Sequence, residues 1–238
     1  MSNQPFHFKQ FLIKQDACAM KIGTDSVLLG AWAHIDHQPQ TVLDIGAGSG
    51  VLALMIAQRS PTVFVEAIEI DEKAFEQCVD NFENSPWSDR LFCYHASLIE
   101  FVEEVDETYD LIICNPPFYS EDYKTENKSR NLARFESSMP FEHLIYCAIK
   151  LLSTQGHLNV IIPFKEEQRF LTLAKSMQLF PERITRIKGN DQSELKRSLI
   201  DLSFDKKETK ENILLIETER HKYTEDYIEL TKDFYLNM

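Results

Sequence analysis

A strongly apolar run at residues 109–114, Tyr-Asp-Leu-Ile-Ile-Cys, constrains the fold more than any other stretch of this chain. A continuous apolar run of this length is typical of a strand that is covered on both faces, as strands are in parallel sheets. Pro116 and Pro117 follow it, and because proline has no backbone N–H they end the strand. The sequence therefore predicts an α/β fold with a mainly parallel sheet.

The four residues after this run, Asn115-Pro116-Pro117-Phe118, combine a polar amide, two rigid prolines and an aromatic ring. Open α/β sheets bind ligands at the carboxyl ends of their strands. An amide acceptor beside a flat apolar ring at such a place suggests a pocket for a planar group with an exocyclic amine, such as a nucleobase, or for a side-chain amide. An ordinary exit from a strand into a loop would account for the prolines alone.

Residues 41–50 form a second informative stretch, in which an apolar strand turns through three glycines into a helix that begins at Val51. Glycines at Gly46, Gly48 and Gly50 are expected where a backbone must approach a ligand closely. The spacing is Gly-x-Gly-x-Gly, whereas the dinucleotide fingerprint needs its third glycine at position 51. The sequence therefore disfavours a nicotinamide cofactor.

A further apolar strand at residues 62–71 carries two carboxylates at its end. Glu69 lies at the distance downstream of the glycines where ribose-binding acids are found in such folds, so it is the candidate acceptor for ribose hydroxyls. Asp71 precedes a helix predicted over residues 72–82 and is the candidate N-cap of that helix.

The rest of the chain continues the alternation of strands and helices without internal repeats. Further strands are predicted at residues 91–96, 157–162, 182–188, 197–204 and 212–216. Further helices are predicted at residues 98–105, 141–152 and 165–177. The last strands are expected to end the sheet as an antiparallel hairpin-like pair. Residues 119–139 are too long for a routine connection and are interpreted as a substrate lid.

Together, the glycine turn and the Asn-Pro-Pro-Phe motif resemble those of the class I S-adenosylmethionine-dependent methyltransferases, specifically the branch that methylates amino groups. Other segments look like the bacterial tRNA adenine-N6 methyltransferases, which are understood to modify the adenosine just 3′ of the anticodon in a valine tRNA. These segments are residues 6–11, 18–25, 29–33, 85–87, 223–227 and 230–236. The resemblance therefore spans nearly the whole chain.

The resemblance implies a single Rossmann-like α/β domain over residues 1–238, with a seven-stranded, mostly parallel sheet covered by helices on both faces. Residues 1–36 are expected to form an N-terminal cap over the cofactor, and residues 37–238 the catalytic core. The implied cofactor is S-adenosylmethionine, and the implied partner is a tRNA substrate.

The family comparison also implies roles for individual residues at the cofactor. Asp44 is expected to anchor the glycine turn or the amino group of the cofactor, and Asn115 to face the cofactor as well as the substrate. Lys21 and Thr24 match the N-terminal motif of the family and are expected to close over the cofactor. Ser97 stands where the family often has an aspartate that meets the adenine amino group, so it is a candidate substitute.

The expected chemistry follows from adenine itself, because the N6 lone pair is delocalised into the ring and is a poor nucleophile. The side-chain carbonyl of Asn115 and the backbone carbonyl of Pro116 are the candidate catalytic acceptors that hold the N6 hydrogens and direct the lone pair at the sulfonium methyl group. Phe118 would stack on the base. The candidate substrate-binding residues are Pro117, Phe118, Tyr119, Lys124, Lys128, Arg130 and Arg134.

Net charge fits poorly with an RNA substrate. The chain has 25 Lys and Arg against 38 Asp and Glu, a formal net charge of -13, while RNA is a polyanion. Local charge matters more at contact distance, since salt screens charges beyond roughly 8 Å. Clusters at residues 183–188 and 196–197, with Lys9, Lys14 and Lys21, are candidates for a phosphate track together with the cations of the 119–139 loop.

We expect a compact cytoplasmic monomer, because 43% of the residues are hydrophobic and no apolar stretch reaches membrane-spanning length. The polar N-terminus lacks the hydrophobic segment of a signal peptide. Five dispersed cysteines without a Cys-x-x-Cys pair indicate neither a disulfide framework nor a zinc site. His34 and His37 could share a helical face, but with no third ligand in view we expect no metal.

Three alternatives stay open at the level of the sequence. The same motif serves methyl transfer to guanine N2, to DNA adenine or to a protein glutamine amide, because each presents an exocyclic or amide nitrogen. A non-catalytic RNA-binding module could keep the fold as a scaffold, although the intact Asn115, Glu69 and three glycines argue against it. A nicotinamide dehydrogenase is disfavoured by the glycine spacing.

Overall fold

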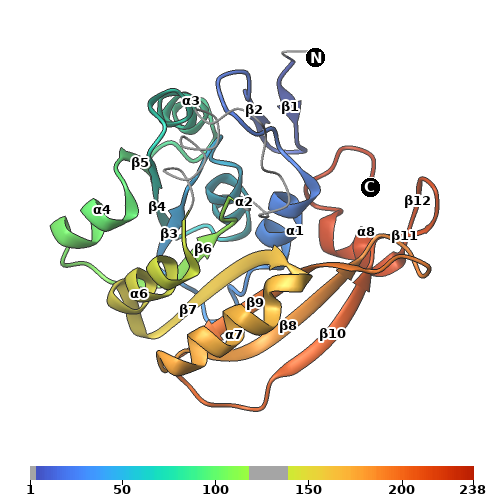
Figure 1. The fold of residues 1–238 in the computed structure, drawn as a ribbon. Helices are drawn as coiled ribbons and strands as arrows, with labels where there is room; N and C mark the ends of the chain where they lie inside the picture. The colour runs from blue at the N-terminus through green and yellow to red at the C-terminus, as the bar shows by residue number, and fades with distance from the viewer. Residues whose placement is uncertain (1–3, 118–138) are drawn as a thin grey trace, which may run out of the picture.

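A twisted eight-stranded sheet forms the centre of the protein, and helices cover both of its faces (Figure 1). The computed structural model describes residues 4–117 and 139–238. The strand order is β10-β8-β9-β7-β6-β3-β4-β5. The strands are β3 (Thr41–Ile45), β4 (Phe64–Glu69), β5 (Leu91–His95), β6 (Tyr109–Cys114), β7 (Leu152–Pro163), β8 (Phe180–Lys188), β9 (Leu195–Ser203) and β10 (Lys210–Leu215). The expected parallel α/β architecture is confirmed.

The far end of the sheet differs from the expectation in two respects. The sheet has eight strands rather than seven. The antiparallel hairpin is formed by β8 and β9, and β10 then crosses back to pair with the outer edge of β8 in parallel. β9 is antiparallel to both of its neighbours, while every other pair in the sheet is parallel. Local sequence patterns predict where strands occur but not which strands pair, so the sequence did not predict this order.

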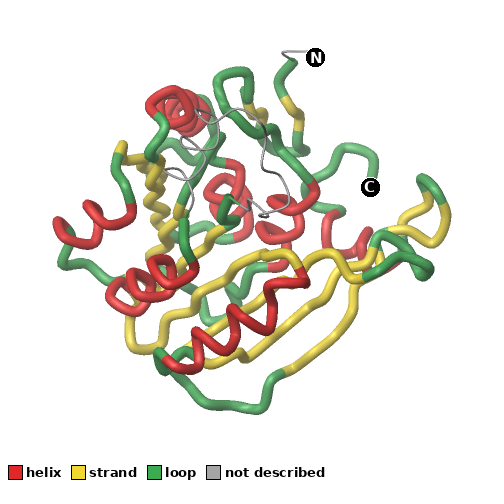
Figure 2. Tube along the Cα trace, in the orientation of Figure 1, coloured by secondary structure: helices red, strands yellow, loops and turns green. Residues whose placement is uncertain are grey.

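The helices divide into two sets, one on each face of the sheet (Figure 2). The first face carries α1 (Thr24–Trp32), α2 (Val51–Arg59), α3 (Glu72–Glu83) and α8 (Glu225–Thr231). The second carries α4 (Leu98–Glu104), α6 (Phe141–Leu151) and α7 (Glu167–Ser176), the last preceded by the short 3₁₀ helix η2 (Phe164–Glu166). Both faces of the central strands are therefore buried, as their continuous apolar runs predict.

Alternation along β3 sends its side chains to both faces. Val42 packs into the apolar cluster under α1 and α2, while Leu43 and Ile45 pack into the cluster under α6. All three are 0% exposed. Asp44 lies between them in the same strand, so its side chain faces the α2 side of the sheet and is carried into the interior with it.

Two helices begin at side-chain caps that hold their first turns. The Asp71 side chain accepts a hydrogen bond from Ala74 N at 2.9 Å, which confirms it as the N-cap of α3. Thr224 caps α8 in the same way through Tyr227 N at 3.2 Å. Both caps satisfy backbone donors that the first turn of a helix leaves without partners.

The N-terminal segment packs directly into the core. Gly30 of α1 lies against α2 so closely that an added Cβ would come within 2.6 Å of Met55 Sδ. Trp32 donates a hydrogen bond from Nε1 to Thr185 Oγ1 at 2.8 Å, which joins α1 to β8. Removing residues 1–36 would therefore expose an apolar face of the sheet, and we propose that cap and core fold as one unit.

The two ends of the described chain meet. The hairpin of β1 (Phe6–His7) and β2 (Leu12–Ile13) precedes α1, and Phe8 forms an isolated antiparallel bridge with Tyr235. Phe8 stacks on Phe11 at 4.6 Å between ring centroids and on Tyr235 at 6.2 Å. The terminal segments that resemble the methyltransferase family thus pack on each other.

A second hairpin, β11 (Glu217–Glu219) and β12 (Lys222–Tyr223), leads into α8. Among the described helices, none has the length and apolar character that a membrane span requires.

Candidate active site

The candidate site lies where four neighbouring parallel strands end. Ile45 of β3 pairs with Cys114 of β6 on one side and with Ile68 of β4 on the other. Glu69 in turn pairs with His95 of β5. The glycine turn, the Asn-Pro-Pro motif, Glu69 and the start of α4 therefore meet at one edge of the sheet, because each directly follows or ends one of these strands.

The glycine turn is held against β4 by its own backbone. Gly46 N and Ala47 N both donate to Ile68 O, at 2.9 and 3.0 Å. Gly46 and Gly48 adopt φ values of 72° and 56°, in the left-handed region that glycine tolerates best. A Cβ at either position would meet no atom within 4 Å, so both glycines border open space that a ligand can enter.

Gly50 differs from the other two glycines. It is buried, and a Cβ there would lie 2.5 Å from Phe82 Cε1 and 2.9 Å from Cys78 Sγ of α3. Its φ of 80° is also left-handed. Gly50 therefore allows α3 to pack against the start of α2. Of these three glycines, only Gly46 and Gly48 border space that a ligand can enter.

Asp44 is a fully buried carboxylate with one unsatisfied oxygen. Its Oδ2 accepts a hydrogen bond from Ala53 N at 3.2 Å, which anchors the first turn of α2. Its Oδ1 has no hydrogen-bond partner within the described structure. Burial raises the pKa of Asp44 to about 7, and the nearby charge of Glu69 adds to the effect. An orphaned acceptor of this kind is suited to a cationic ligand group such as the amino group of S-adenosylmethionine.

Glu69 braces the glycine turn from the end of β4. Its Oε2 accepts from Gly48 N at 2.8 Å and its Oε1 accepts from Asp71 N at 2.9 Å. These two bonds hold the carboxylate in place, and each oxygen keeps a further lone pair for a ribose hydroxyl. Ile70, the next residue, is 58% exposed and offers an apolar surface at the same edge, which sequence reasoning missed.

Asn115 is oriented by a residue that sequence reasoning did not find. Its Nδ2 donates to Ser26 Oγ of α1 at 3.0 Å. With the NH₂ end of the amide turned to α1, the carbonyl Oδ1 is the other end, and an acceptor is what an amine substrate needs. Pro116 is buried, and Pro117 is partly buried. No signal in the sequence links Ser26 to a motif 89 residues away.

The start of α1 lies over this edge of the sheet. Asp25 forms an ion pair with Arg197 of β9, with 2.7 Å between Oδ2 and Nε, and Ser26 contacts Asn115. Thr24 is the first residue of α1 and is exposed, as is Lys21 just before it. The structure thus brings the segment that carries Lys21 and Thr24 next to the end of β6.

Ser97 is at the expected edge but has a structural partner. It caps α4 in a capping box, in which Ser97 Oγ accepts from Glu100 N at 3.3 Å and Glu100 Oε2 accepts from Ser97 N at 3.0 Å. These hydrogen bonds lower the pKa of Glu100. The Ser97 hydroxyl can donate as well as accept a hydrogen bond, whereas an aspartate would offer only acceptors.

Six of the predicted substrate residues lie outside the described residues, as does the predicted lid apart from residue 139. They are Phe118, Tyr119, Lys124, Lys128, Arg130 and Arg134.

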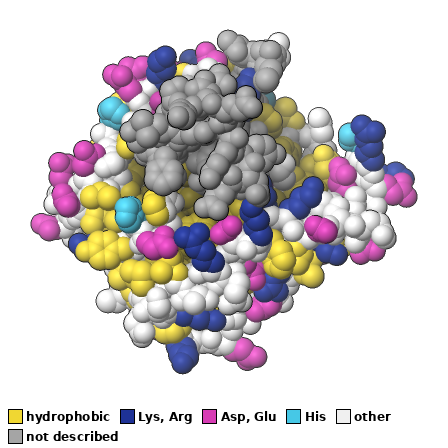
Figure 3. Space-filling view, viewed as in Figure 1, with side chains coloured by type: hydrophobic (Ala, Val, Ile, Leu, Met, Phe, Trp, Pro, Cys, Tyr) yellow, Lys and Arg dark blue, Asp and Glu magenta, His cyan; other side chains and the backbone are white. Residues whose placement is uncertain are grey.

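The basic clusters that are described are largely engaged within the protein. Arg183 stacks over Trp32 at 3.8 Å from the ring centroid and donates to the Trp32 carbonyl at 2.7 Å. Arg186 pairs with Glu167 at 2.7 Å and with Glu211 at 2.8 Å. On the face shown in Figure 3, Lys and Arg side chains are interspersed with Asp and Glu. Arg183 and Arg186 therefore both join elements of the fold.

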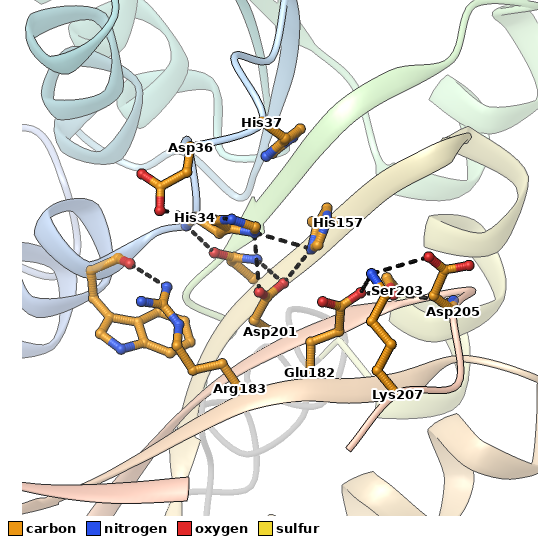
Figure 4. A network of polar contacts seen from close by, with 12 residues as sticks. His34, Asp36, His37, His157, Glu182, Arg183, Asp201, Ser203, Asp205 and Lys207 are labelled. Carbon is orange, nitrogen blue, oxygen red and sulfur yellow. Dashed lines mark hydrogen bonds and ion pairs between the residues drawn. The ribbon is translucent and has the colours of Figure 1, made fainter. Parts of the chain in front are cut away.

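The histidine prediction requires a correction. His34 and His37 do not share a helical face, because α1 ends at Trp32 and both lie in the loop that follows. A third histidine, His157 of β7, lies beside them, and one ligand atom of each lies within 4.8 Å of the others. His157 was not predicted, because it lies 123 residues from His34 in the sequence. This cluster lies near the amino end of β6, where His37 contacts the Asp110 carbonyl and His157 pairs with Leu111, so it is away from the glycine turn. Figure 4 shows its polar contacts.

Comparison with known proteins identifies the family. A family model described as the methyltransferase small domain matches residues 19–180. A tRNA1(Val) (adenine(37)-N6)-methyltransferase from Flavobacterium psychrophilum is 61% identical over 98% of this chain and 100% of its own. Proteins of the same name from Christiangramia forsetii and Trichodesmium erythraeum are 58% and 41% identical, over 100% and 99% of both chains.

Solved structures show the same fold. A predicted O-methyltransferase from Agrobacterium tumefaciens has a TM-score of 0.66 at 20% identity, and covers 88% of this chain and 96% of that chain. TYW2 from P. horikoshii in complex with MeSAdo has a TM-score of 0.57 at 18% identity, over 84% and 71%. From the family model and the full-length identities, the chain belongs to the methyltransferase small domain family and, within it, to the tRNA1(Val) (adenine(37)-N6)-methyltransferases.

Proposed function

We propose that this protein transfers a methyl group from S-adenosylmethionine to the exocyclic N6 of an adenosine in tRNA, and that the target is adenosine 37 beside the anticodon of a valine tRNA. The single observation that carries the proposal is the oriented amide of Asn115 beside the glycine turn. Identity of 61% to a full-length relative of that name supports the choice of substrate.

The described residues fit the cofactor. Gly46 and Gly48 leave open space at the turn, and Asp44, whose Oδ1 has no partner in the described structure, lies two residues before Gly46 in β3. We assign Asp44 to the cationic amino group, Glu69 to the ribose hydroxyls and Ser97 to the adenine edge. Bound S-adenosylmethionine supplies an electrophilic methyl group on its sulfonium. Lys21 and Thr24 cover the same edge of the sheet from the start of α1.

The amide of Asn115 acts on the amine rather than on the methyl group. Its Oδ1 and the backbone carbonyl of Pro116 accept hydrogen bonds from the two N6 hydrogens, which favours a pyramidal nitrogen with an available lone pair. Ser26 keeps the amide from rotating, because it accepts from Nδ2. No strong base is needed before attack, and the proton leaves once the nitrogen has become cationic.

The remaining substrate contacts belong to the segment after the motif. We assign Pro117 and Phe118 to the faces of the base and Tyr119 to the shape of its pocket. The cations Lys124, Lys128, Arg130 and Arg134 are assigned to the phosphates. A local positive segment is sufficient in a chain with a net charge of -13, because phosphate contacts act within a Debye length.

A methyl-transfer assay tests the proposal. Purified protein is incubated with methyl-labelled S-adenosylmethionine and tRNA from a strain that lacks this enzyme, and the digested nucleosides are identified by mass spectrometry. We expect label in N6-methyladenosine, and sequencing of the labelled fragment should place it at position 37 of a valine tRNA. Label in another nucleoside would refute the adenine assignment, and transfer to protein alone would refute the tRNA assignment.

A further inference from the structure

Three histidines form a compact cluster near the amino end of β6, away from the carboxyl end where the glycine turn lies. Figure 4 shows the cluster and its polar contacts. His34 and His37 come from the loop after α1, and His157 comes from β7. Their ring centroids form a triangle with edges of 4.6, 4.8 and 5.0 Å. It is the one group among the described residues whose His, Cys or carboxylate ligand atoms are close enough to share a metal ion.

The spacing of two of these rings matches metal coordination. His34 Nδ1 and His157 Nδ1 are 3.4 Å apart. Zinc lies roughly 2.0–2.1 Å from imidazole nitrogens in a tetrahedral site, which places two such nitrogens about 3.3 Å from each other. A zinc ion can therefore be held between His34 and His157 with little movement of either ring.

His37 provides an independent observation. Its Nε2 is 3.1 Å from the carbonyl of Asp110, a contact that requires the proton on Nε2. Nδ1 is then a bare acceptor, and it is buried without a hydrogen-bond partner in the described structure. A backbone carbonyl that orients the far nitrogen of an imidazole is the usual arrangement behind a metal-binding histidine.

Asp201 supplies negative charge at the same place. Its Oδ1 accepts from His157 Nδ1 and from Asn159 Nδ2, both at 2.8 Å, and its Oδ2 lies 3.4 Å from His34 Nδ1. The carboxylate is 3% exposed. A buried aspartate shared by two imidazoles explains these contacts without a metal. It does not explain the unpartnered nitrogen of His37.

We propose that His34, His37 and His157 bind one zinc ion, with the buried carboxylate of Asp201 supplying negative charge beside it. Imidazole ligands suit this borderline cation. The ion joins the loop after α1 to β7, so it fastens the N-terminal cap segment to the sheet. The site lies away from the glycine turn and is independent of the proposed methyl transfer.

Zinc binding by tag-free protein is the direct test. The protein is stripped with a chelator and dialysed against zinc chloride, and the metal is counted by mass spectrometry. We expect one zinc per chain in the wild type and in the control variant His143→Ala, whose histidine lies on α6. His37→Ala should weaken zinc binding by more than about 100-fold, because losing only an outer partner of a metal ligand costs 10–100-fold.

Two further measurements distinguish this site from adventitious binding. Cobalt in place of zinc should give the intense visible bands of tetrahedral coordination in the wild type and not in His37→Ala. Zinc should raise the melting temperature of the wild type and of His143→Ala, since a ligand that binds only the folded state stabilises it, and at the same concentration should raise that of His37→Ala less. Absence of stoichiometric zinc in the wild type, or equal zinc in His37→Ala, would overturn the proposal.

Discussion

Two buried aspartates, one near each end of the parallel strands, have opposite electrostatic properties. Asp44, before the glycine turn, has one backbone donor and one unpartnered oxygen, and burial raises its pKa to about 7. Burial alone would also raise the pKa of Asp201, but hydrogen bonds from His157 and His34 lower it to about 2. A buried carboxylate with too few hydrogen-bond donors can accept a ligand, while one with several donors stabilises the fold.

The same contrast extends to the surrounding residues. At the glycine turn, Gly46 and Gly48 border open space, and Asp44 Oδ1 lacks a partner. Around Asp201, Asn159 and His157 donate to the carboxylate, and Asn159 Oδ1 accepts from His34 N at 2.7 Å. The region around Asp44 is less stable locally because one acceptor is unsatisfied, and it can bind a ligand. The region around Asp201 contributes stability by joining the N-terminal segment to the sheet.

The largest effect is expected from Asn115→Ala. We expect the rate of methyl transfer to fall about 10²- to 10³-fold, as when one preorganised hydrogen-bonding group is removed from an active site. Cofactor affinity and melting temperature should change little, because the Asn115 side chain contributes one hydrogen bond to the fold. Asn84→Ala, in an exposed helix end of α3, is the matched control. Full activity in Asn115→Ala would remove this residue from the mechanism.

The next effect is a pH dependence of stability that belongs to Asp44. Folding raises its pKa from 3.8 to about 7, so in this window the unfolded chain releases a proton that the folded protein keeps. Stability therefore falls as the pH rises from 3.8 to about 7, by on the order of 4 kcal/mol for a shift of about three pKa units. Asp44→Asn cannot ionise and should lack this component.

Chemical denaturation at pH 5 and pH 8 measures it. The unfolding free energy of Asp44→Asn minus that of the wild type should be larger at pH 8 than at pH 5. The same difference at both pH values would show that Asp44 is not desolvated. Saturating S-adenosylmethionine should reduce the pH dependence in the wild type, because a cationic amino group stabilises the ionised carboxylate.

Somewhat smaller effects are expected from the glycines, because Gly50 serves folding and Gly48 serves cofactor binding. Gly50→Ala should lower the unfolding free energy by about 3 kcal/mol, since its Cβ would overlap Phe82 and Cys78 and its φ is left-handed. Gly48→Ala carries only the backbone cost of about 1–2 kcal/mol but should weaken cofactor binding. Calorimetry of unfolding and of cofactor binding on both variants checks this, and equal effects on both quantities would contradict it.

The smallest effect is expected from Ser26→Ala. The loss of one hydrogen bond to Asn115 should lower the turnover rate about 10-fold, with the KM for S-adenosylmethionine unchanged. Ser26→Thr keeps the hydroxyl and should restore most of the activity. Ser176→Ala, at the end of α7, serves as a control away from the site. A change in KM without a change in turnover would refute the positioning role.

Much of the carboxyl edge was predictable because its parts are local in sequence. Asp44, Glu69 and Asn115 each lie at or directly after the end of a strand, and the apolar runs show where those strands end. Asp71 was recognisable as a cap for the same reason, since a cap acts within three residues.

The other features of the site depended on distant partners. Gly50 has the same spacing and φ sign as its neighbours, and only α3 packing distinguishes it from Gly46 and Gly48. Arg186 belongs to a basic cluster in the sequence, and only the tertiary structure shows that it pairs with Glu167. A charge pattern cannot show whether a partner from another element lies within 4 Å.

The sequence by itself determined the α/β alternation, the glycine turn and the motif after β6, because strand ends and tight turns are set by residues within a few positions of each other. Only the tertiary structure decided that Ser26 orients Asn115, 89 residues away, and that His157 joins His34 across 123 residues. Such contacts arise from how helices and strands pack as rigid units, and the eighth strand and its order in the sheet were settled in the same way.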